Sequence, residues 1–401
     1  MTKKSDAPAI RFKGFSDAWE QRKFEEIAVR SSVICSDDTL PRVEYEDIVS
    51  GTGRLNKDIY AKQSIKSGIA FHQGDVLYGK LRPYLQNWLL PTFDGLAVGD
   101  FWVLQPQNAD SSFLYRLIQS RQFDEVANQS TGTKMPRADW KLVSKTVFSI
   151  PSNISEQAAI GTYFTALDSL ITLHQRKFEK LTNVKKSMLE KMFPQNGSSY
   201  PEIRFKGFTD PWEQRKVSDL AEKTYGGGTP TTSNEAYWNG DIPWIQSSDV
   251  VDGKLLGVEP RKWITQDGLN NSAAQLIPGN SIAIITRVGV GKLAFMPYSY
   301  ATSQDFLSLS KLNAEPLFTV YACYKKLQSE LNAVQGTSIK GITKDELLAK
   351  NIMVPRYAEQ QQIGAFFKQL DHLITLHQRK PFLMKWRTSD ANRNQTNRLV
   401  L

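Results

Sequence analysis

The sequence is poor in cysteine and histidine and contains no long apolar run. Of its 401 residues, two are cysteine and four are histidine. Two cysteines, Cys35 and Cys323, provide neither the disulfide framework of a small secreted domain nor the paired spacing of a metal site. The N-terminus lacks a signal-peptide core, and no segment approaches the length of a membrane span. We therefore expect a cytoplasmic protein with no metal site and no membrane contact.

Short catalytic motifs are also missing. The stretch RVGVGK (287–292) is rich in glycine and ends in lysine. A phosphate-binding P-loop, however, needs four residues between its first glycine and the Gly-Lys pair. The sequence has no Gly-x-Ser-x-Gly elbow and no Asn/Asp-Pro-Pro-aromatic motif of the methyltransferase type. These absences favour an interaction protein over an enzyme and predict that the chain binds no cofactor.

The sequence is instead rich in apolar material and in basic residues. Hydrophobic residues make up 40% of the chain, which is enough for two or more packed domains. Fifty Lys and Arg residues outnumber 41 Asp and Glu residues and give a formal net charge of +9. A basic excess of this size suits a polyanion partner such as DNA.

Two segments of the sequence occur twice. IRFKGFSDAWEQRK (10–23) returns as IRFKGFTDPWEQRK (203–216) with 12 of 14 positions identical. LDSLITLHQRK (167–177) returns as LDHLITLHQRK (370–380) with 10 of 11 identical. The blocks between these anchors have diverged. Uniform drift after a duplication would not preserve the ends while changing the middles. We infer that the variable blocks meet two different targets and the repeated blocks meet one partner twice.

Each variable block is predicted to be a mixed α+β domain. Short β-type runs such as DFWVLQP, KTVFSIP and NSIAIITRVG are separated by turn residues, and helical patterns such as SSFLYRLIQS and LFTVYACYKKLQSELNAV lie between them. About 150 residues is an ordinary domain size. The predicted division is a first domain, a first spacer helix, a second domain and a second spacer helix, at 1–150, 151–200, 201–355 and 356–401.

The repeated block is predicted to be a long helix. Asn153 or Ser155 can cap its start, and no proline or glycine interrupts residues 162–193. Apolar residues recur at heptad spacing, which is typical of a helix that packs along another helix, here its own copy. The predicted packing positions are Leu167, Ile171, His174, Phe178, Leu181, Met188, Leu370, Ile374 and His377. For the two histidines, packing is favoured over a shared metal, because no further ligands occur at suitable spacing.

The second copy of this helix carries a proline. Pro381 stands where the first copy has Phe178, and the residues that follow show no heptad pattern. A proline inside a helix removes a backbone donor and clashes with the preceding turn. We therefore expect the second helix to kink or stop after Lys380. Either a change of reading frame or a natural variant tail explains this sequence.

Basic residues, aromatic residues and glycine-threonine pairs gather in predicted loops. Cations position a protein on phosphates, while Arg, Lys and hydroxyl side chains also read base edges. For any single residue a solvated surface loop is the alternative, but matched placement in both halves favours DNA contact for the group. The candidate residues are Lys80, Arg82, Tyr84, Thr133, Lys134, Arg137, Thr286, Arg287, Lys292, Thr337, Ser338 and Lys340.

The order of these features resembles the specificity subunit of a type I restriction–modification system. The resemblance rests on the duplicated RFKGF-D-WEQRK, the GKLRPYL loop, and a proline followed by an EQ--I--YF--LD-LI-LHQRK helix. It implies two target-recognition domains joined by an antiparallel pair of spacer helices in a pseudo-twofold arrangement. Each domain would read one half of a bipartite double-stranded DNA target, and the spacer would set the gap.

The resemblance also implies that the chain itself is not catalytic. Two methyltransferase subunits would bind it and methylate adenine N6 with S-adenosylmethionine, and restriction subunits using ATP and Mg would join them. Two other functions stay open from the residues alone. One is a self-sufficient DNA-modifying enzyme, which the missing motifs disfavour, and the other is a bivalent protein-binding scaffold.

Overall fold

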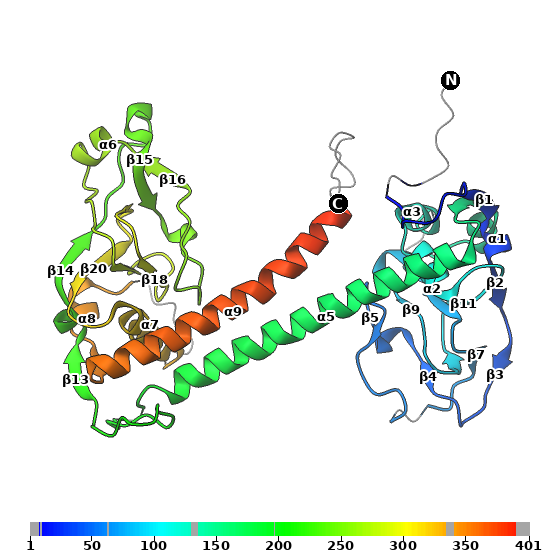
Figure 1. The fold of residues 1–401 in the computed structure, drawn as a ribbon, viewed down its shortest axis with the longest axis horizontal. Helices are drawn as coiled ribbons and strands as arrows, with labels where there is room; N and C mark the ends of the chain where they lie inside the picture. Colours follow the sequence, from blue (N-terminus) through cyan, green and yellow to red (C-terminus); the bar gives the residue numbers. More distant parts are fainter. Residues whose placement is uncertain are drawn as a thin grey trace. The chain divides into compact units, whose positions relative to one another are not determined.

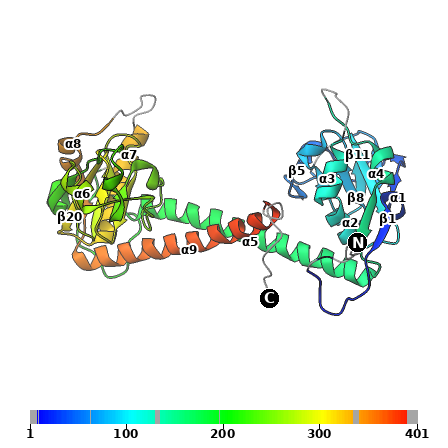
Figure 2. The same ribbon diagram turned by 90° about the horizontal axis from the view of Figure 1, so that it is seen from above.

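The chain divides into two compact units, Met1–Ile171 (unit 1) and Thr172–Leu401 (unit 2). Their elements are drawn in Figures 1 and 2. The computed structural model describes Pro8 and residues 10–61, 64–129, 135–195, 197–333 and 341–389. Helix α5 (Ile154–Lys191) begins in unit 1 and ends in unit 2.

Unit 1 contains two four-stranded sheets. The first is antiparallel in the order β2 (Ala28–Ser31), β11 (Phe101–Pro106), β8 (Val76–Gly79), β9 (Trp88–Leu89). The second has the order β3 (Ile34–Cys35), β7 (Gly68–Phe71), β10 (Gly95–Ala97), β4 (Arg42–Val43). The two-stranded pairs are β1 (Glu20–Lys23) with β12 (Val147–Ile150), and β5 (Ile48–Val49) with β6 (Arg54–Leu55). The helices before α5 are α1 (Phe24–Ile27), α2 (Ser111–Leu117), α3 (Arg121–Ala127), α4 (Trp140–Lys145) and the 3-10 turns η1 (Tyr45–Asp47) and η2 (Pro83–Leu85).

Unit 2 repeats this plan. Its sheets have the orders β14 (Ala221–Gly226), β20 (Phe306–Leu312), β17 (Ser281–Ile285), β18 (Leu293–Met296), and β16 (Lys262–Ile264), β15 (Trp238–Ile245), β19 (Ala301–Thr302). Strand β13 (Glu213–Lys216) pairs with β21 (Asn351–Val354). The helices are α6 (Gln266–Asn270), α7 (Pro316–Ala333), α8 (Lys344–Leu348), α9 (Tyr357–Ser389) and the 3-10 turns η3 (Val217–Leu220), η4 (Glu235–Tyr237) and η5 (Ser247–Asp249).

The predicted α+β fold and the duplication are confirmed. The runs DFWVLQP, KTVFSIP and NSIAIITRVG form β11, β12 and β17, and the two helical patterns form α2 and α7. Strand pairing repeats as well: Phe101 lies opposite Gly79 in unit 1, and Phe306 lies opposite Ile285 in unit 2. The duplication therefore extends through the diverged blocks, although their sequences differ.

The identical ends of the two copies hold each long helix to its own unit. The Arg11 guanidinium binds Glu156 at the start of α5 with N–O distances of 2.6 Å, and Arg204 binds Glu359 on α9 at 2.7 and 2.8 Å. Glu156 and Glu359 are buried, so each carboxylate depends on its arginine for charge compensation. Part of the sequence identity therefore serves internal packing rather than a partner.

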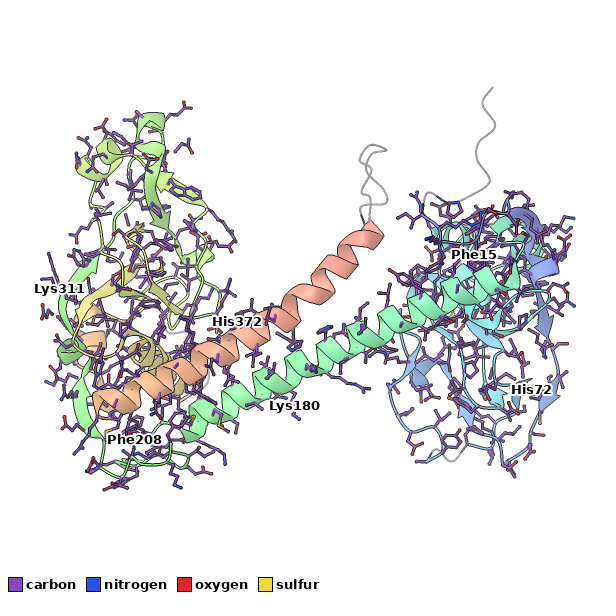
Figure 3. All side chains as sticks on the ribbon, viewed as in Figure 1. Phe15, His72, Lys180, Phe208, Lys311 and His372 are labelled. Atoms are coloured by element: carbon purple, nitrogen blue, oxygen red, sulfur yellow. The ribbon has the colours of Figure 1, made fainter. Side chains whose placement is uncertain are left out.

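The C-terminal half of α5 packs antiparallel to α9 within unit 2. Nδ1 of His174 lies 2.8 Å from Nδ1 of His377, and Nζ of Lys185 lies 2.5 Å from Oδ1 of Asp371. A later residue on α5 thus meets an earlier residue on α9. Figure 3 shows the side chains of both helices, with Lys180 labelled on α5 and His372 on α9.

The predicted packing positions of the two long helices are shielded to different extents. Leu370 is buried, and the half-buried positions are Leu167, Ile171, His174, Phe178, Leu181, Met188, Ile374 and His377. Asn153 caps α5, because its Oδ1 accepts a hydrogen bond from the Ser155 N–H at 2.8 Å. The predicted packing positions therefore form a face that is half-buried along most of its length.

Of the two outcomes expected after Lys380, a kink or a stop, the stop does not occur. Helix α9 continues through Pro381 to Ser389. A proline removes one backbone donor, but a helix can continue past that position when the local geometry adjusts. The residues after Pro381 nevertheless lack the apolar heptad spacing of the first copy.

A glycine permits close approach of α9 to α7. A Cβ atom built at Gly364 would lie 2.6 Å from Glu315 Oε2, 2.8 Å from Leu317 Cβ and 2.9 Å from the Phe318 backbone nitrogen. Gly364→Ala is therefore expected to lower the free energy of unfolding by about 1–2 kcal/mol, because overpacking outweighs the better helix propensity of alanine. Urea unfolding measures this, with exposed Ala365→Ser as the near-neutral control. A stabilised Gly364→Ala variant would contradict the prediction.

Candidate nucleic-acid interface

The loop that follows β8 in unit 1 is fixed by backbone hydrogen bonds to two distant segments. The Lys80 N–H donates to the Asp100 carbonyl at 2.9 Å, and the Ala138 N–H donates to the Lys80 carbonyl at 2.8 Å. The Arg82 N–H donates to the Pro136 carbonyl at 2.7 Å. The predicted residues Lys80, Arg82 and Arg137 are thereby brought together, although more than 50 residues separate the two loops.

Asp100 is the charged centre of this arrangement. Its carboxylate lies 3.0 Å from Nη2 of Arg137 and 3.5 Å from Nζ of Lys80. Burial by itself would raise the pKa of Asp100, but hydrogen bonding and attraction to the two cations lower it below its ordinary value. Asp100 therefore stays ionised and holds both basic side chains at the same loop surface.

The Tyr45 hydroxyl links the loop that contains Leu81 to the segment that contains Asp100. Its hydroxyl donates to the Asp100 carbonyl at 2.6 Å and accepts from the Leu81 N–H at 2.9 Å. Burial raises the pKa of Tyr45 well above its ordinary value, so the hydroxyl remains a neutral donor. The ring also packs against Phe101, with centroids 4.6 Å apart.

Tyr84 and Arg82, two predicted residues of this loop, differ in exposure, because Arg82 is half-buried. Tyr84 is 56% exposed. Arg82 has a φ of 50°, in the left-handed region that residues other than glycine rarely adopt. Its Nε is buried and has no hydrogen-bond partner among the described residues. Strained conformations of this kind cluster at binding sites, so the φ of Arg82 makes this loop a candidate for one.

Unit 2 uses the same backbone frame with different side chains. The Thr286 N–H donates to the Asp305 carbonyl and the Ile342 N–H donates to the Thr286 carbonyl, both at 2.8 Å. These bonds repeat those of Lys80 in unit 1. Thr286, however, is buried, and its hydroxyl donates to the Asp305 carbonyl at 3.1 Å. Its side chain therefore supports the loop itself.

Other candidate residues in unit 2 lie nearby in the same β17–β18 loop. Arg287 is exposed and Lys292 is half-buried. Gly289, with a φ of 91°, forms the turn between them, and its carbonyl accepts a hydrogen bond from the Lys292 N–H at 3.3 Å. The other candidates lie outside the described residues, namely Thr133, Lys134, Thr337, Ser338 and Lys340.

Two residues that organise this loop surface, Tyr45 and Asp100, are absent from the set predicted from the sequence. A signal for Asp100 was available, since the Asp-Phe pair at 100–101 recurs at 305–306. Tyr45 had no such signal, because unit 2 has Ser247 at the corresponding start of η5. Neither residue was chosen, because an acidic or phenolic side chain does not by itself point to a nucleic-acid interface.

Within the described part of the chain, no group of three or more His, Cys, Asp or Glu side chains could hold a metal ion. No helix there is both long enough and apolar enough to cross a membrane. The candidate site consists of two matched loop surfaces, one in each unit, built on one backbone plan and carrying different side chains.

Matched domains with diverged loops define a class of duplicated recognition proteins, and comparison with known proteins identifies the family. The family model described as "Type I restriction modification DNA specificity domain" matches residues 32–183 and 209–382. These two matches cover most of the chain, one in each half. The chain belongs to this family, as the resemblance predicted.

Curated relatives and solved structures agree. The chain is 31% identical over 227 residues to the type I restriction enzyme EcoR124I/EcoR124II specificity subunit of Escherichia coli, covering 55% of this chain and 52% of that one. It is 29% identical over 170 residues to the MjaIX specificity subunit of Methanocaldococcus jannaschii, covering 41% of this chain and 38% of that one. The matched segments thus span about half or less of these relatives.

Among solved structures, the type I restriction–modification S subunit from M. genitalium has a TM-score of 0.60. Its sequence identity is 11%, and the match covers 94% of this chain and 96% of that one. A likeness at this identity shows the fold alone.

Proposed function

We propose that this chain is the DNA-recognition subunit of a type I restriction–modification complex. Each unit reads one half of a bipartite double-stranded target through its loop surface. The observation that carries the proposal is the shared backbone frame with different side chains. Lys80 and Thr286 make the same two backbone hydrogen bonds, but Lys80 adds a cation to its surface and Thr286 does not. Such a frame allows two half-sites of different sequence.

The long helices suit the role of a spacer. Helix α5 has 38 residues and is therefore about 57 Å long, at about 1.5 Å per residue. Half-sites read from one side of DNA lie about one helical turn, ~34 Å, or multiples of it apart. A helix of this length can hold two recognition domains at such a separation and so set the unspecified gap.

Catalysis belongs to partner subunits in this proposal. Methylation of adenine N6 requires the base to leave the stack, a task for a methyltransferase that carries S-adenosylmethionine. Cleavage belongs to restriction subunits that use ATP and Mg.

Exposed leucines recur at matched positions of α5 and α9: Leu173 is 47% exposed and Leu376 is 45% exposed. Equivalent apolar positions on two copies of one helix suit two copies of one methyltransferase subunit.

Exchange of the first variable block tests this proposal. A chain in which residues 24–132 come from a relative with a different target is expected to change one half-site and leave the other half-site and the gap unchanged. Methylome sequencing of cells that express the chain with its methyltransferase partner reports target, gap and modified adenines together. The unexchanged chain and the reciprocal exchange in the second half are the controls.

Three results would contradict the proposal. A simultaneous change of both half-sites would exclude independent reading by the two units. Methylation or cleavage of DNA by the isolated chain would show a self-sufficient enzyme. The absence of any sequence preference by the chain with its methyltransferase partner would favour a protein-binding scaffold.

A further inference from the structure

The last turns of α5 cover an aromatic surface in unit 2. Phe193, just beyond the helix end, lies with its ring centroid 6.0 Å from Trp212, 5.8 Å from Phe318 and 6.0 Å from Phe367. Leu189 and Met192 belong to the same buried cluster. As a result, Phe367 is 0% exposed. The segment 181–193 thus acts as a cover for this side of α9.

Unit 1 contains the same surface on α5. The hydrogen bonds from the Asp110 N–H to Gln157 and from the Glu315 N–H to Gln360, at 2.9 and 2.8 Å, place α2 against α5 as α7 is placed against α9. By this correspondence, Trp19, Phe113 and Phe164 in unit 1 match the three aromatic residues that surround Phe193 in unit 2.

The two surfaces differ in exposure. Phe164 is 45% exposed, whereas its counterpart Phe367 is 0% exposed. Tyr163 and Phe12, which pack edge to face at 5.6 Å, are 43% and 38% exposed. We call Phe12, Tyr163, Phe164 and Trp19 the aromatic face of unit 1. Three of these four residues, Phe12, Tyr163 and Phe164, are exposed, and exposed aromatic residues that gather in one patch are typical of an interaction surface.

The C-terminal sequence of this chain lacks the residues that would cover the aromatic face as 181–193 cover unit 2. Adding the repeat offset of 203 to Val184, Leu189, Met192 and Phe193 gives Arg387, Asn392, Gln395 and Thr396. Three apolar residues and an aromatic anchor are thus replaced by polar side chains, which cannot form an equivalent apolar contact.

We propose that the aromatic face of unit 1 binds an amphipathic helix with the apolar spacing of residues 181–193, supplied by a separate polypeptide. The equivalent surface in this same molecule already holds such a helix, and the aromatic residues that receive Phe193 recur in unit 1. One contact differs between the units. Lys185 on the covering segment binds Asp371 at 2.5 Å, whereas the counterpart carboxylate, Asp168, has a side chain 53% exposed and binds Arg116 at 2.7 Å. Arg116 stands where unit 2 has Tyr321, and its guanidinium lies 5.9 Å from the centroid of the Phe164 ring.

A labelled peptide tests this proposal on the full chain. A fluorescent peptide with the sequence of residues 178–193 is expected to bind saturably, as measured by fluorescence anisotropy. Phe193→Ala in the peptide should weaken binding about tenfold or more, because an aromatic anchor in a pocket dominates such contacts. Phe164→Arg in the chain should weaken it by a similar factor. Leu170→Arg, an equally exposed position about 120° around α5 from Phe164, is the matched control and should leave affinity unchanged.

Two results would overturn the proposal. One is the absence of saturable binding at peptide concentrations of about 0.2 mM. This concentration is far above the dissociation constant expected for a specific contact between a helix and a groove. The other is equal binding by wild type and Phe164→Arg, which would place the peptide elsewhere. Circular dichroism and the melting temperature verify that Phe164→Arg is folded, and Tyr163→Arg provides a second variant with the same expected loss.

Discussion

Glu359→Ala is expected to lower the free energy of unfolding of unit 2 by about 3 kcal/mol. Removal of one member of a buried ion pair typically costs about 3–5 kcal/mol, because the other charge is left without a partner. Arg204 forms both of its 2.7 and 2.8 Å bonds to this single carboxylate, and these bonds raise the pKa of Arg204 above its ordinary value. Its side chain is 14% exposed, so some water reaches it, and we expect the lower end of the range.

Urea unfolding followed by tryptophan fluorescence measures the loss, and a surface ion pair provides the control. Lys191 and Glu202 lie 2.6 Å apart with side chains 41% and 65% exposed. Glu202→Ala should therefore change the free energy of unfolding by less than about 0.5 kcal/mol. Equal effects of the two substitutions would show that Glu359 does not hold α9 to its unit. Glu156→Ala should act in the same direction in unit 1.

Phe367→Ala is expected to cost about 3–5 kcal/mol of unfolding free energy, whereas Phe164→Ala should cost about 1 kcal/mol. The two residues occupy equivalent positions of the duplicated helix. Phe367 is fully buried and contacts Tyr321 and Phe193, with centroids 5.0 and 6.0 Å away. Its loss leaves a cavity that the surrounding rings cannot fill. Phe164 is 45% exposed, so its removal leaves space that water already reaches.

Thermal unfolding of the two variants measures this difference directly, since each serves as the matched control of the other. The comparison depends on burial and not on residue type, because both substitutions remove the same side chain from the same kind of helix. Equal losses would mean that Phe164 is covered to the same extent as Phe367. That outcome would also remove the basis for a free aromatic face on unit 1.

The residues predicted for the interface do not include the residues that organise its loops. The sequence predicts Lys80, Arg82 and Arg137 as contact residues, because cations next to glycine and proline turns suit phosphate contact. Their assembly, however, depends on Asp100 and Tyr45, which come together across 55 positions of the chain. Local sequence patterns carry no information on such contacts, because strand order and not sequence distance decides which loops meet.

The end of the second helix shows the same limit. Pro381 removes a backbone hydrogen bond, and the sequence therefore predicts a kink or a stop after Lys380. Helix α9 nevertheless continues to Ser389. Intrinsic propensity is a weak guide to where a helix ends. The cost of one lost backbone hydrogen bond is weighed against the stabilisation from all the helical turns on either side.

The sequence by itself determined the duplication, the α+β class, the principal strands and long helices, and the family. These properties follow from repeated sequence segments and from the spacing of apolar and turn residues. Both are local features that can be recognised along a single sequence. The tertiary structure alone decided which equivalent residues are buried. Phe164 and Phe367 occupy equivalent positions of the duplicated helix, yet Phe367 is fully buried with Phe193 packed against it, and Phe164 is 45% exposed. Burial depends on what covers a side chain, and that covering segment is distant in sequence.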